Sequence, residues 1–208
     1  MKYDMMARLY WKVFKGGFER ELKNTLGMSD TEVVMKKAHK KYREMLESVQ
    51  PFERKTRFIS NIILASILGS VYISLDKKPD IEKMTVFARE ALMNNRVMLK
   101  AIVSERNYTV EGQEMLRRQA EISLTDNNPY SWQYTFEAGG TLMEYTATFK
   151  TCGILHLYRM WGIEELTPAM CKLDYDMAAA NNTKFIREQT LADGGEYCDC
   201  HYIHTPKK

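Results

Sequence analysis

The sequence lacks the motifs that mark several large enzyme classes. It has no glycine-rich phosphate-binding loop, no dinucleotide-binding fingerprint, no internal repeat and no low-complexity tract. Residues 1–8 carry charges where a secretory signal peptide needs an uninterrupted apolar segment, so we expect a cytoplasmic protein. The 4 cysteines are then expected to be reduced thiols and not disulfides.

A strong net charge of one sign is also absent. The formal net charge is +3, with 23 basic and 17 acidic residues in 1–128 and 7 basic and 10 acidic residues in 129–208. The densest basic run is Lys36–Arg43, which could contact nucleic acid or an anionic membrane. Glu44 and Glu47 follow directly and a helix needs a solvated face, so we expect no nucleic-acid partner.

A membrane-spanning segment is not favoured either. The segment Phe58–Leu75 carries no formal charge, and its length is enough to consider a membrane span. Ser60, Asn61 and Gly69 suit a helix buried in a bundle better, so we expect no membrane partner. The same apolar helix, together with the 14 methionines of the chain, leaves a homodimer open.

The N-terminal part shows the spacing of apolar residues that is typical of helices. Gly16 and Gly17 predict a break in the first helix, and Asp80 can cap the fourth. The predicted helices span residues 3–26, 29–48, 58–75, 80–105 and 110–124.

Beyond residue 128 the pattern changes to the period of strands. Trp132, Tyr134 and Phe136 alternate with polar residues, and a turn at Ala138–Gly140 leads into a second alternating run, so the two runs predict a hairpin. Helices are predicted at 152–160 and 168–180, and the closing strands at 185–191 and 197–203, joined through Gly194 and Gly195.

These elements predict an α+β fold. A chain of this size can bury a full core and suits one domain, 1–208. We expect its N-terminal helical layer (1–128) to pack on a C-terminal antiparallel sheet (129–208) made of hairpins with two intervening helices.

The last predicted strand presents two different sets of reactive side chains. Because alternate residues of a strand share a face, Cys198 and Cys200 point one way while Asp199 and His201 point the other. Cys198 and His201 therefore do not form a nucleophile and base pair by themselves, and His156 would be a better partner. The alternative is that Cys198 is a small core residue of this strand.

A metal site is a further possibility. Cys152 and His156 lie four residues apart on a predicted helix and so share a face. With Cys198 or His201 and a carboxylate they offer the sulfur, nitrogen and oxygen ligands of a tetrahedral zinc ion. A packed cysteine beside a capping histidine is the alternative. Zinc is therefore the one candidate cofactor.

Asp174, Asp176 and Arg187 add charged groups to the same region. The two acids are two residues apart on a helix and do not face each other, so one can enter a pocket while the other meets solvent. Arg187 lies on a predicted strand where positive charge is scarce. Its guanidinium can hold a substrate carboxylate or form a cross-strand ion pair with a nearby acid.

An ordered set of residues in this region resembles a known signature. The set comprises Cys152, Gly162–Leu166, Cys171, Asp174, Asp176, Asn181, Asn182, Arg187, Thr190, Leu191, Gly194, Gly195, Cys198 and Asp199. In order and spacing it resembles the signature in the C-terminal third of the L-2-amino-thiazoline-4-carboxylic acid hydrolase family. The layout is more loosely similar to the small-ligand-binding domains related to 4-vinyl reductases.

The first resemblance implies a hydrolase that acts on a cyclic, amidine-like C–N bond and opens 2-amino-thiazoline-4-carboxylate to N-carbamoyl-cysteine. It implies that Cys198 or a bound metal supplies the attack on the ring carbon and that Arg187 binds the substrate carboxylate. Proton transfer would fall to Asp176, as the inward acid, or to Asp199. The other substrate-binding candidates are Cys171, Thr190, Trp132 and Tyr134.

The second resemblance implies a non-enzymatic ligand-binding or sensory domain. Its pocket would lie between the helical layer and the sheet and would be lined by Trp132, Tyr134, Phe136, Met143 and Tyr145. An apolar pocket with one or two cysteines would favour a hydrophobic ligand. Arg187 and an acid converging on the same cavity would favour a small zwitterion.

Overall fold

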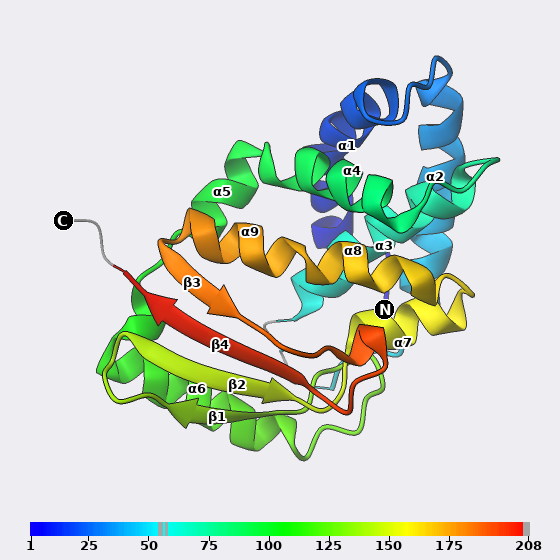
Figure 1. Cartoon of the computed structure of the whole chain (residues 1–208). Coiled ribbons are helices and arrows are strands. Elements are labelled where there is room, and N and C mark those ends of the chain that lie inside the picture. Colours follow the sequence, from blue (N-terminus) through cyan, green and yellow to red (C-terminus); the bar gives the residue numbers. More distant parts are fainter. Residues whose placement is uncertain (54–55, 57, 206–208) are drawn as a thin grey trace.

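A computed structural model describes residues 1–53, 56 and 58–205 of the chain. It consists of a helical bundle beside an antiparallel sheet of four strands, and further helices cover one face of this sheet (Figure 1). The predicted α+β class, with a helical N-terminal part and hairpins separated by helices, is confirmed.

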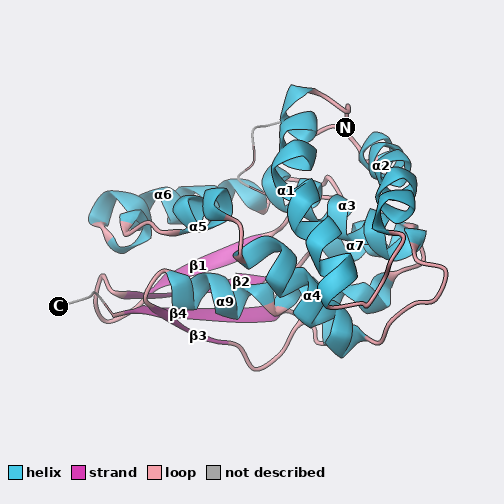
Figure 2. Ribbon diagram, turned by 90° about the horizontal axis from the view of Figure 1, so that it is seen from above, coloured by secondary structure: helices cyan, strands magenta, loops and turns pink. Residues whose placement is uncertain are grey.

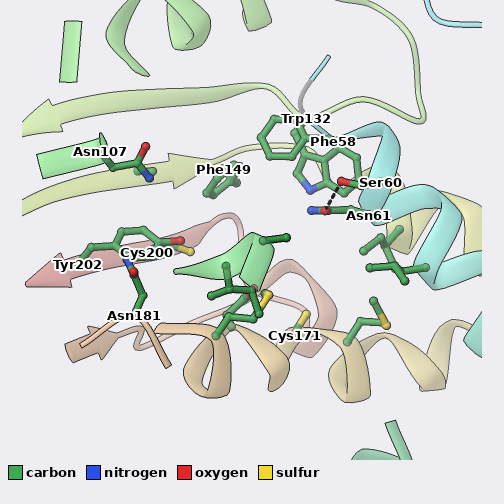
Figure 3. A pocket seen from close by; sticks show the side chains of 18 of the residues that line it. Phe58, Ser60, Asn61, Asn107, Trp132, Phe149, Cys171, Asn181, Cys200 and Tyr202 are labelled. Carbon is green, nitrogen blue, oxygen red and sulfur yellow. Dashed lines mark hydrogen bonds between the residues drawn. The ribbon is translucent and has the colours of Figure 1, made fainter. Parts of the chain in front are cut away.

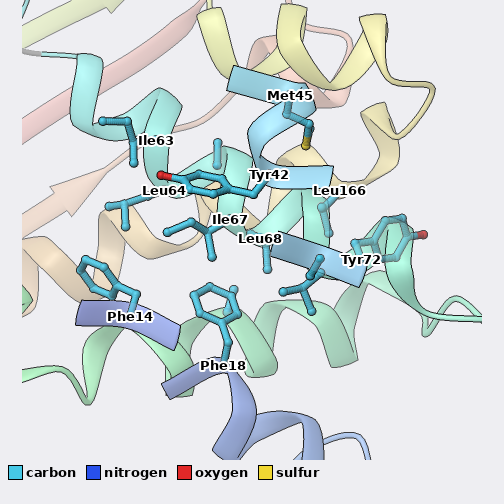
Figure 4. Close-up of a cluster of buried hydrophobic side chains, with 14 of the residues drawn as sticks. Phe14, Phe18, Tyr42, Met45, Ile63, Leu64, Ile67, Leu68, Tyr72 and Leu166 are labelled. Atoms are coloured by element: carbon cyan, nitrogen blue, oxygen red, sulfur yellow. The ribbon is translucent and has the colours of Figure 1, made fainter. Parts of the chain in front are cut away.

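The bundle is built around an almost wholly apolar helix. Its members are α1 (Met5–Asn24), α2 (Thr31–Ser48), α3 (Ile59–Ser74) and α4 (Ile81–Met93). Every residue from 62 to 72 of α3 is buried, and Figure 4 shows side chains of α3 such as Ile67 and Leu68 packed among those of α1 and α2, including Phe18. Burying one such side chain contributes about 1.5–3 kcal/mol.

The serines of α3 explain how polar residues can occupy this core. The hydroxyl of Ser66 donates to the carbonyl of Ile62, and that of Ser74 donates to the carbonyl of Ser70, so no donor is left without a partner. The helix is therefore a core helix, as its polar and small residues indicated. In the described part of the chain no helix has the length and apolarity to cross a bilayer. Because α3 is buried, it offers no apolar surface to a second copy.

The predicted break at Gly16 and Gly17 is wrong, because α1 continues through both. A Cβ at Gly17 would come within 2.5 Å of the Ala91 carbonyl oxygen on α4, whereas a Cβ at Gly16 would meet nothing within 4 Å. Gly17 therefore allows the two helices to pack closely. Glycine costs an interior helix position about 1 kcal/mol, which the interhelical packing offsets.

The predicted fourth helix is two helices. After α4 the side chain of Asn95 accepts hydrogen bonds from the N–H groups of Val97 and Met98 and so caps a new helix, α5 (Arg96–Ile102). A short 3₁₀ turn (Arg106–Tyr108) leads to α6 (Val110–Ser123), which packs on the first strand of the sheet and not in the bundle.

The sheet has the order β1-β2-β4-β3, with all neighbours antiparallel. Its strands are β1 (Tyr134–Ala138), β2 (Glu144–Phe149), β3 (Thr183–Ile186) and β4 (Cys198–His204). The last strand of the chain is thus interior, between β2 and β3. In the β2–β4 register Phe149 lies opposite Cys198 and Tyr145 opposite Tyr202.

Two shifts of boundary affect the candidate site. The helix predicted at 168–180 is two segments joined at Lys172, and Arg187 follows the end of β3 and so lies on a loop. The intervening helices are α7 (Gly153–Met160), α8 (Thr167–Cys171) and α9 (Leu173–Ala180), with 3₁₀ turns at Glu164–Leu166 and Leu191–Asp193. Gly194 supplies the left-handed turn, with φ of 86°, before β4.

Figure 2 shows that α5, α6 and α9 lie on one face of the sheet, while no helix of the described residues lies on the other. The inner residues Tyr145 and Ala147 of β2 are buried, whereas their neighbours Thr146 and Thr148 face outward and are partly exposed. Helix α6 of the N-terminal helical part packs on β1, and α7 and α8 of the C-terminal part contact the bundle helices α3 and α4.

Candidate active site

A cavity of about 790 Å³ lies between the inner face of the sheet and the helices above it. Trp132 and Tyr134 line it as predicted, joined by Phe58 and Phe149. Figure 3 shows Trp132 and Phe58 together at one end, with Phe149 nearer the middle. The rings of Phe58 and Trp132 have centroids 4.8 Å apart. The cavity is therefore largely aromatic, as a small-molecule site commonly is.

All four cysteines of the chain line this cavity as free thiols. Cys198 and Cys200 reach it from the inner face of β4, so the predicted sharing of a face is confirmed. Cys171 ends α8 and projects from the opposite wall (Figure 3). Cys152 is the N-cap of α7, where its sulfur accepts the N–H of Leu155 at 3.5 Å.

The thiols are all harder to ionise than an ordinary cysteine. Burial raises the pKa of Cys152 to about 11 and that of Cys200 to about 12, and it also raises the pKa of Cys171. Burial raises the pKa of Cys198 too, but the N–H of Leu191, 3.3 Å from its sulfur, and the charge of Arg187 offset part of that effect. Cys198 is therefore the most readily ionised of the four.

An ion pair between Asp174 and Arg187 forms the charged part of the cavity wall. Arg187 Nη1 donates to Asp174 Oδ2 at 2.7 Å, and Nη2 donates to the carbonyl of Cys171 at 2.8 Å. The arginine side chain is only 4% exposed, whereas the aspartate side chain is 35% exposed and lines the cavity. The predicted ion pair thus exists, with an acid from α9 and not from a neighbouring strand.

Asp174 and Arg187 differ in how their surroundings affect them. Desolvation raises the pKa of Asp174, against the opposing pull of the Arg187 charge and hydrogen bond, so this carboxyl group is suited to exchanging protons. The remaining guanidinium nitrogen, Nε of Arg187, has no hydrogen-bond partner among the described residues. This nitrogen is buried, so Arg187 acts on the cavity through its charge and through Asp174.

The acid that points inward is Asp174, and the expectation for Asp176 is reversed. Asp176 accepts a hydrogen bond from Arg89 Nε of α4 at 3.0 Å and is not among the residues that line the cavity. The two acids diverge as predicted, but the docking of α9 on the sheet, which the sequence does not reveal, turns Asp174 to the cavity.

Asp199 and Thr190 also lie outside the cavity lining and instead hold the loop before β4. The Asp199 carboxylate accepts the backbone N–H groups of Glu188 and Gln189 at 2.9–3.2 Å. Burial opposes its ionisation, but these N–H groups outweigh it and lower the pKa of Asp199. The hydroxyl of Thr190 caps the 3₁₀ turn by accepting the Asp193 N–H at 3.0 Å.

The structure does not assemble the predicted zinc ligands. His156 packs edge-on against Tyr130, with centroids 4.7 Å apart, and does not line the cavity. His201 lies on the outer face of β4, where its Nδ1 shares a 2.8 Å hydrogen bond with Thr146. Cys152 and Cys198 face the cavity without either histidine. Within the described ranges no three His, Cys, Asp or Glu side chains gather in a way that could hold a metal ion.

The structure also brings residues to the cavity that sequence reasoning did not select. Phe58 and Asn61 come from the start of α3, and Gln119 from α6. Gln119 Oε1 and Thr167 Oγ1 are buried without a partner in the described chain. The one signal for these residues was Asn61, a polar residue in an otherwise apolar helix.

Comparison with known proteins identifies the family of this chain. A family model for L-2-amino-thiazoline-4-carboxylic acid hydrolase matches residues 60–202, from the first turn of α3 to β4. The match covers most of the chain and extends well beyond the C-terminal third. No curated protein and no solved structure matches the chain. The protein belongs to the L-2-amino-thiazoline-4-carboxylic acid hydrolase family.

Proposed function

We propose that this protein hydrolyses a thiazoline carboxylate of the 2-amino-thiazoline-4-carboxylate type inside the aromatic cavity. The observation that carries the proposal is the Asp174–Arg187 pair in a cavity that Cys171 and Cys198 also line. Membership of the family supplies the reaction class. The geometry supplies the residues that can carry it out.

The charges of the pair are complementary to those of the substrate. A 2-amino-thiazoline carboxylate carries a cationic N–C–N unit and a carboxylate on one small ring. Asp174 presents its carboxylate to the cavity and can accept two parallel hydrogen bonds from the N–C–N unit. Arg187 lies behind it and is almost wholly buried, so it can attract the substrate carboxylate through its charge while it holds Asp174 in position.

The balance of atoms defines the steps. The product N-carbamoyl-cysteine keeps both nitrogens on the carbon of the former C=N bond and gains an oxygen there. The nucleophile therefore adds to the C=N bond, and the bond that opens the ring joins this carbon to sulfur. Neither nitrogen departs, so the acid has to protonate the departing ring sulfur.

Cys198 is the proposed nucleophile. Its sulfur would attack the ring carbon, the ring sulfur would leave as a thiol, and water would then replace Cys198 and release the product. Asp174 would take the proton of Cys198 and pass it to the departing sulfur. The raised pKa of Cys198 disfavours the thiolate at rest, but a bound cation beside it lowers the free energy of that charge.

The test is the turnover of 2-amino-thiazoline-4-carboxylate by the purified protein, followed by the release of N-carbamoyl-cysteine with and without a chelator. Cys198→Ser and Asp174→Asn should each lower kcat by about 10²-fold or more. Asp176→Asn is the matched control on the same helix, and it should retain activity because Asp176 pairs with Arg89 outside the cavity. Equal losses in both aspartate variants would contradict the assigned roles.

A second candidate is ligand binding without catalysis. It is favoured by the largely aromatic lining and by thiols that are protonated at neutral pH. A well-folded wild-type protein that binds the ring but forms no product would favour this function over the hydrolase.

A further inference from the structure

The cavity is much larger than the ring it is proposed to hold. The ring with its amino and carboxylate groups has roughly nine non-hydrogen atoms, and at no more than about 30 Å³ each they fill at most about 270 Å³. The cavity measures about 790 Å³. About two thirds of the space is therefore left for another part of the ligand.

The excess space extends in one direction. Along β4 the cavity is lined by Cys198, Cys200 and Tyr202, and the four-residue step from Cys198 to Tyr202 spans about 13 Å of strand. On the opposite wall it is lined by Asp174 and Asn181, seven residues and about 10 Å apart along α9. Figure 3 shows Tyr202 and Asn181 together at one end, away from Trp132.

Helix α5 lies over that end and carries apolar side chains that the fold leaves uncovered. Asn181 hydrogen-bonds both backbone groups of Ser104, at 2.8 and 3.0 Å, just after α5. Val97 and Ala101 of α5 line the cavity, yet Val97 is 58% exposed and no residue of this helix is buried.

The neighbouring surface of α1 extends the same apolar wall. The side chain of Asn95, at the start of α5, donates to the carbonyl of Val13 at 3.0 Å and joins the two helices there. Leu9 lines the cavity and is 56% exposed. An apolar group lying between α1 and α5 would remove this surface from water.

We propose that the ligand is a 2-amino-thiazoline-4-carboxylate that bears an extended apolar chain on its exocyclic amino nitrogen, so that it keeps the N–C–N unit that Asp174 would bind. The ring would lie at Asp174 and Arg187, and this placement rests on the function proposed above. The chain would run along Met177 and Tyr202 to the apolar wall made by Leu9 and Val97. The substrate is thus amphipathic, with a charged head and an aliphatic tail.

The reaction on such a substrate balances in the same way. One water adds, its oxygen joins the carbon between the two nitrogens, the bond from this carbon to the ring sulfur breaks, and the sulfur takes a proton. The product is an N-(alkylcarbamoyl)-cysteine with its alkyl chain still between α1 and α5. No oxidant, reductant or further reactant is needed.

Binding tests the tail without depending on turnover. N-octanoyl-L-serine and N-acetyl-L-serine mimic the product with a hydroxyl group in place of its thiol and a carbon in place of its outer nitrogen, and their Kd values are measured by calorimetry on the full chain. Each methylene that becomes buried strengthens binding by up to about fourfold, and ordering of the chain offsets part of this, so the octanoyl compound should bind at least about tenfold more tightly. Equal Kd values for the two compounds would overturn the proposal.

Two valine variants locate the tail. Val97→Gln should remove most of the advantage of the octanoyl compound, because it places an amide in the apolar wall. Val33→Gln is the matched control, since Val33 is a helical valine, 55% exposed, on α2 away from the cavity. Loss of the advantage in the control but not in Val97→Gln would also overturn the proposal.

Turnover measurements test the tail site and the hydrolase function independently of each other. Rates are compared for 2-amino-, 2-methylamino- and 2-heptylamino-thiazoline-4-carboxylate, with the highest kcat/KM expected for the heptylamino compound. Hydrolysis of the two small rings with no preference for the heptyl chain would support the hydrolase and overturn the tail. Chain-dependent binding with no hydrolysis of any ring would support the apolar tail site and overturn the hydrolase.

Discussion

The pair of Asp174 and Arg187 should be strongly coupled in the free energy of unfolding. Asp174→Asn leaves a guanidinium that is 4% exposed without its counter-ion. Such a loss costs about 3–5 kcal/mol, and we expect the lower end because water in the cavity reaches this side of the pair. Arg187→Met removes two charge-assisted hydrogen bonds and leaves a carboxyl group that can take up a proton, at a cost of about 2 kcal/mol.

The double variant keeps neither charge, so its free energy of unfolding should fall by about 2 kcal/mol. Independent effects of the two substitutions would instead add to about 5 kcal/mol. The coupling of about 3 kcal/mol is measured by urea unfolding of the wild type and the three variants at pH 7. The pair of Asp176 and Arg89 is the matched control, because its arginine side chain is 49% exposed, and Asp176→Asn with Arg89→Met should show a coupling below about 1 kcal/mol. Additivity within about 0.5 kcal/mol at Asp174 and Arg187 would refute the reasoning.

Three further predictions concern the helix contact, the thiols and the loop before β4. Gly16→Ala should stabilise the protein by up to about 1 kcal/mol. Gly17→Ala should destabilise it, because the new Cβ would meet the Ala91 carbonyl. Thermal melts of both variants check this. Iodoacetamide at pH 8 should modify Cys198 before the other three thiols, which peptide mass spectrometry would show, since its pKa is the least raised. Because the pKa of Asp199 is lowered in the folded state, its contribution is present above its unfolded pKa of about 3.9 and is lost as pH falls through the folded value. Asp199→Asn should therefore be less stable at pH 7 by about 1 kcal/mol and should lose less stability than the wild type between pH 5 and pH 3 in urea unfolding.

The sequence predicts the elements of this fold well where a period repeats over many residues. The apolar run of α3 and the alternation of β1 and β2 both lie where the patterns place them. The errors fall at single residues whose role depends on distant partners. By local propensity Gly17 is expected to break a helix, but in the fold it allows α1 to approach Ala91 closely. Asn95 starts a new helix although the apolar pattern continues through it.

For the candidate site, too, the sequence predicts what neighbouring residues decide and fails where distant residues decide. Alternation along β4 correctly separates Cys198 from Asp199, because the side-chain period of a strand is local. Helical geometry separates Asp174 from Asp176 equally well, but it does not say which one faces the sheet. That choice depends on how α9 docks, and the interruption at Lys172 shifts the phase of the helix.

The resting charge state of the cavity follows from Asp174 and Arg187 together. Arg187 is needed to keep a carboxylate in a poorly solvated wall, yet the net charge of the pair is close to zero, so it provides little help to a thiolate. The thiols consequently stay mainly protonated while the cavity holds no cation. In the proposed mechanism, a substrate that brings its own positive charge to Asp174 changes this balance in favour of ionised Cys198. Cys198 would then become a reactive thiolate mainly when the correct head group is bound.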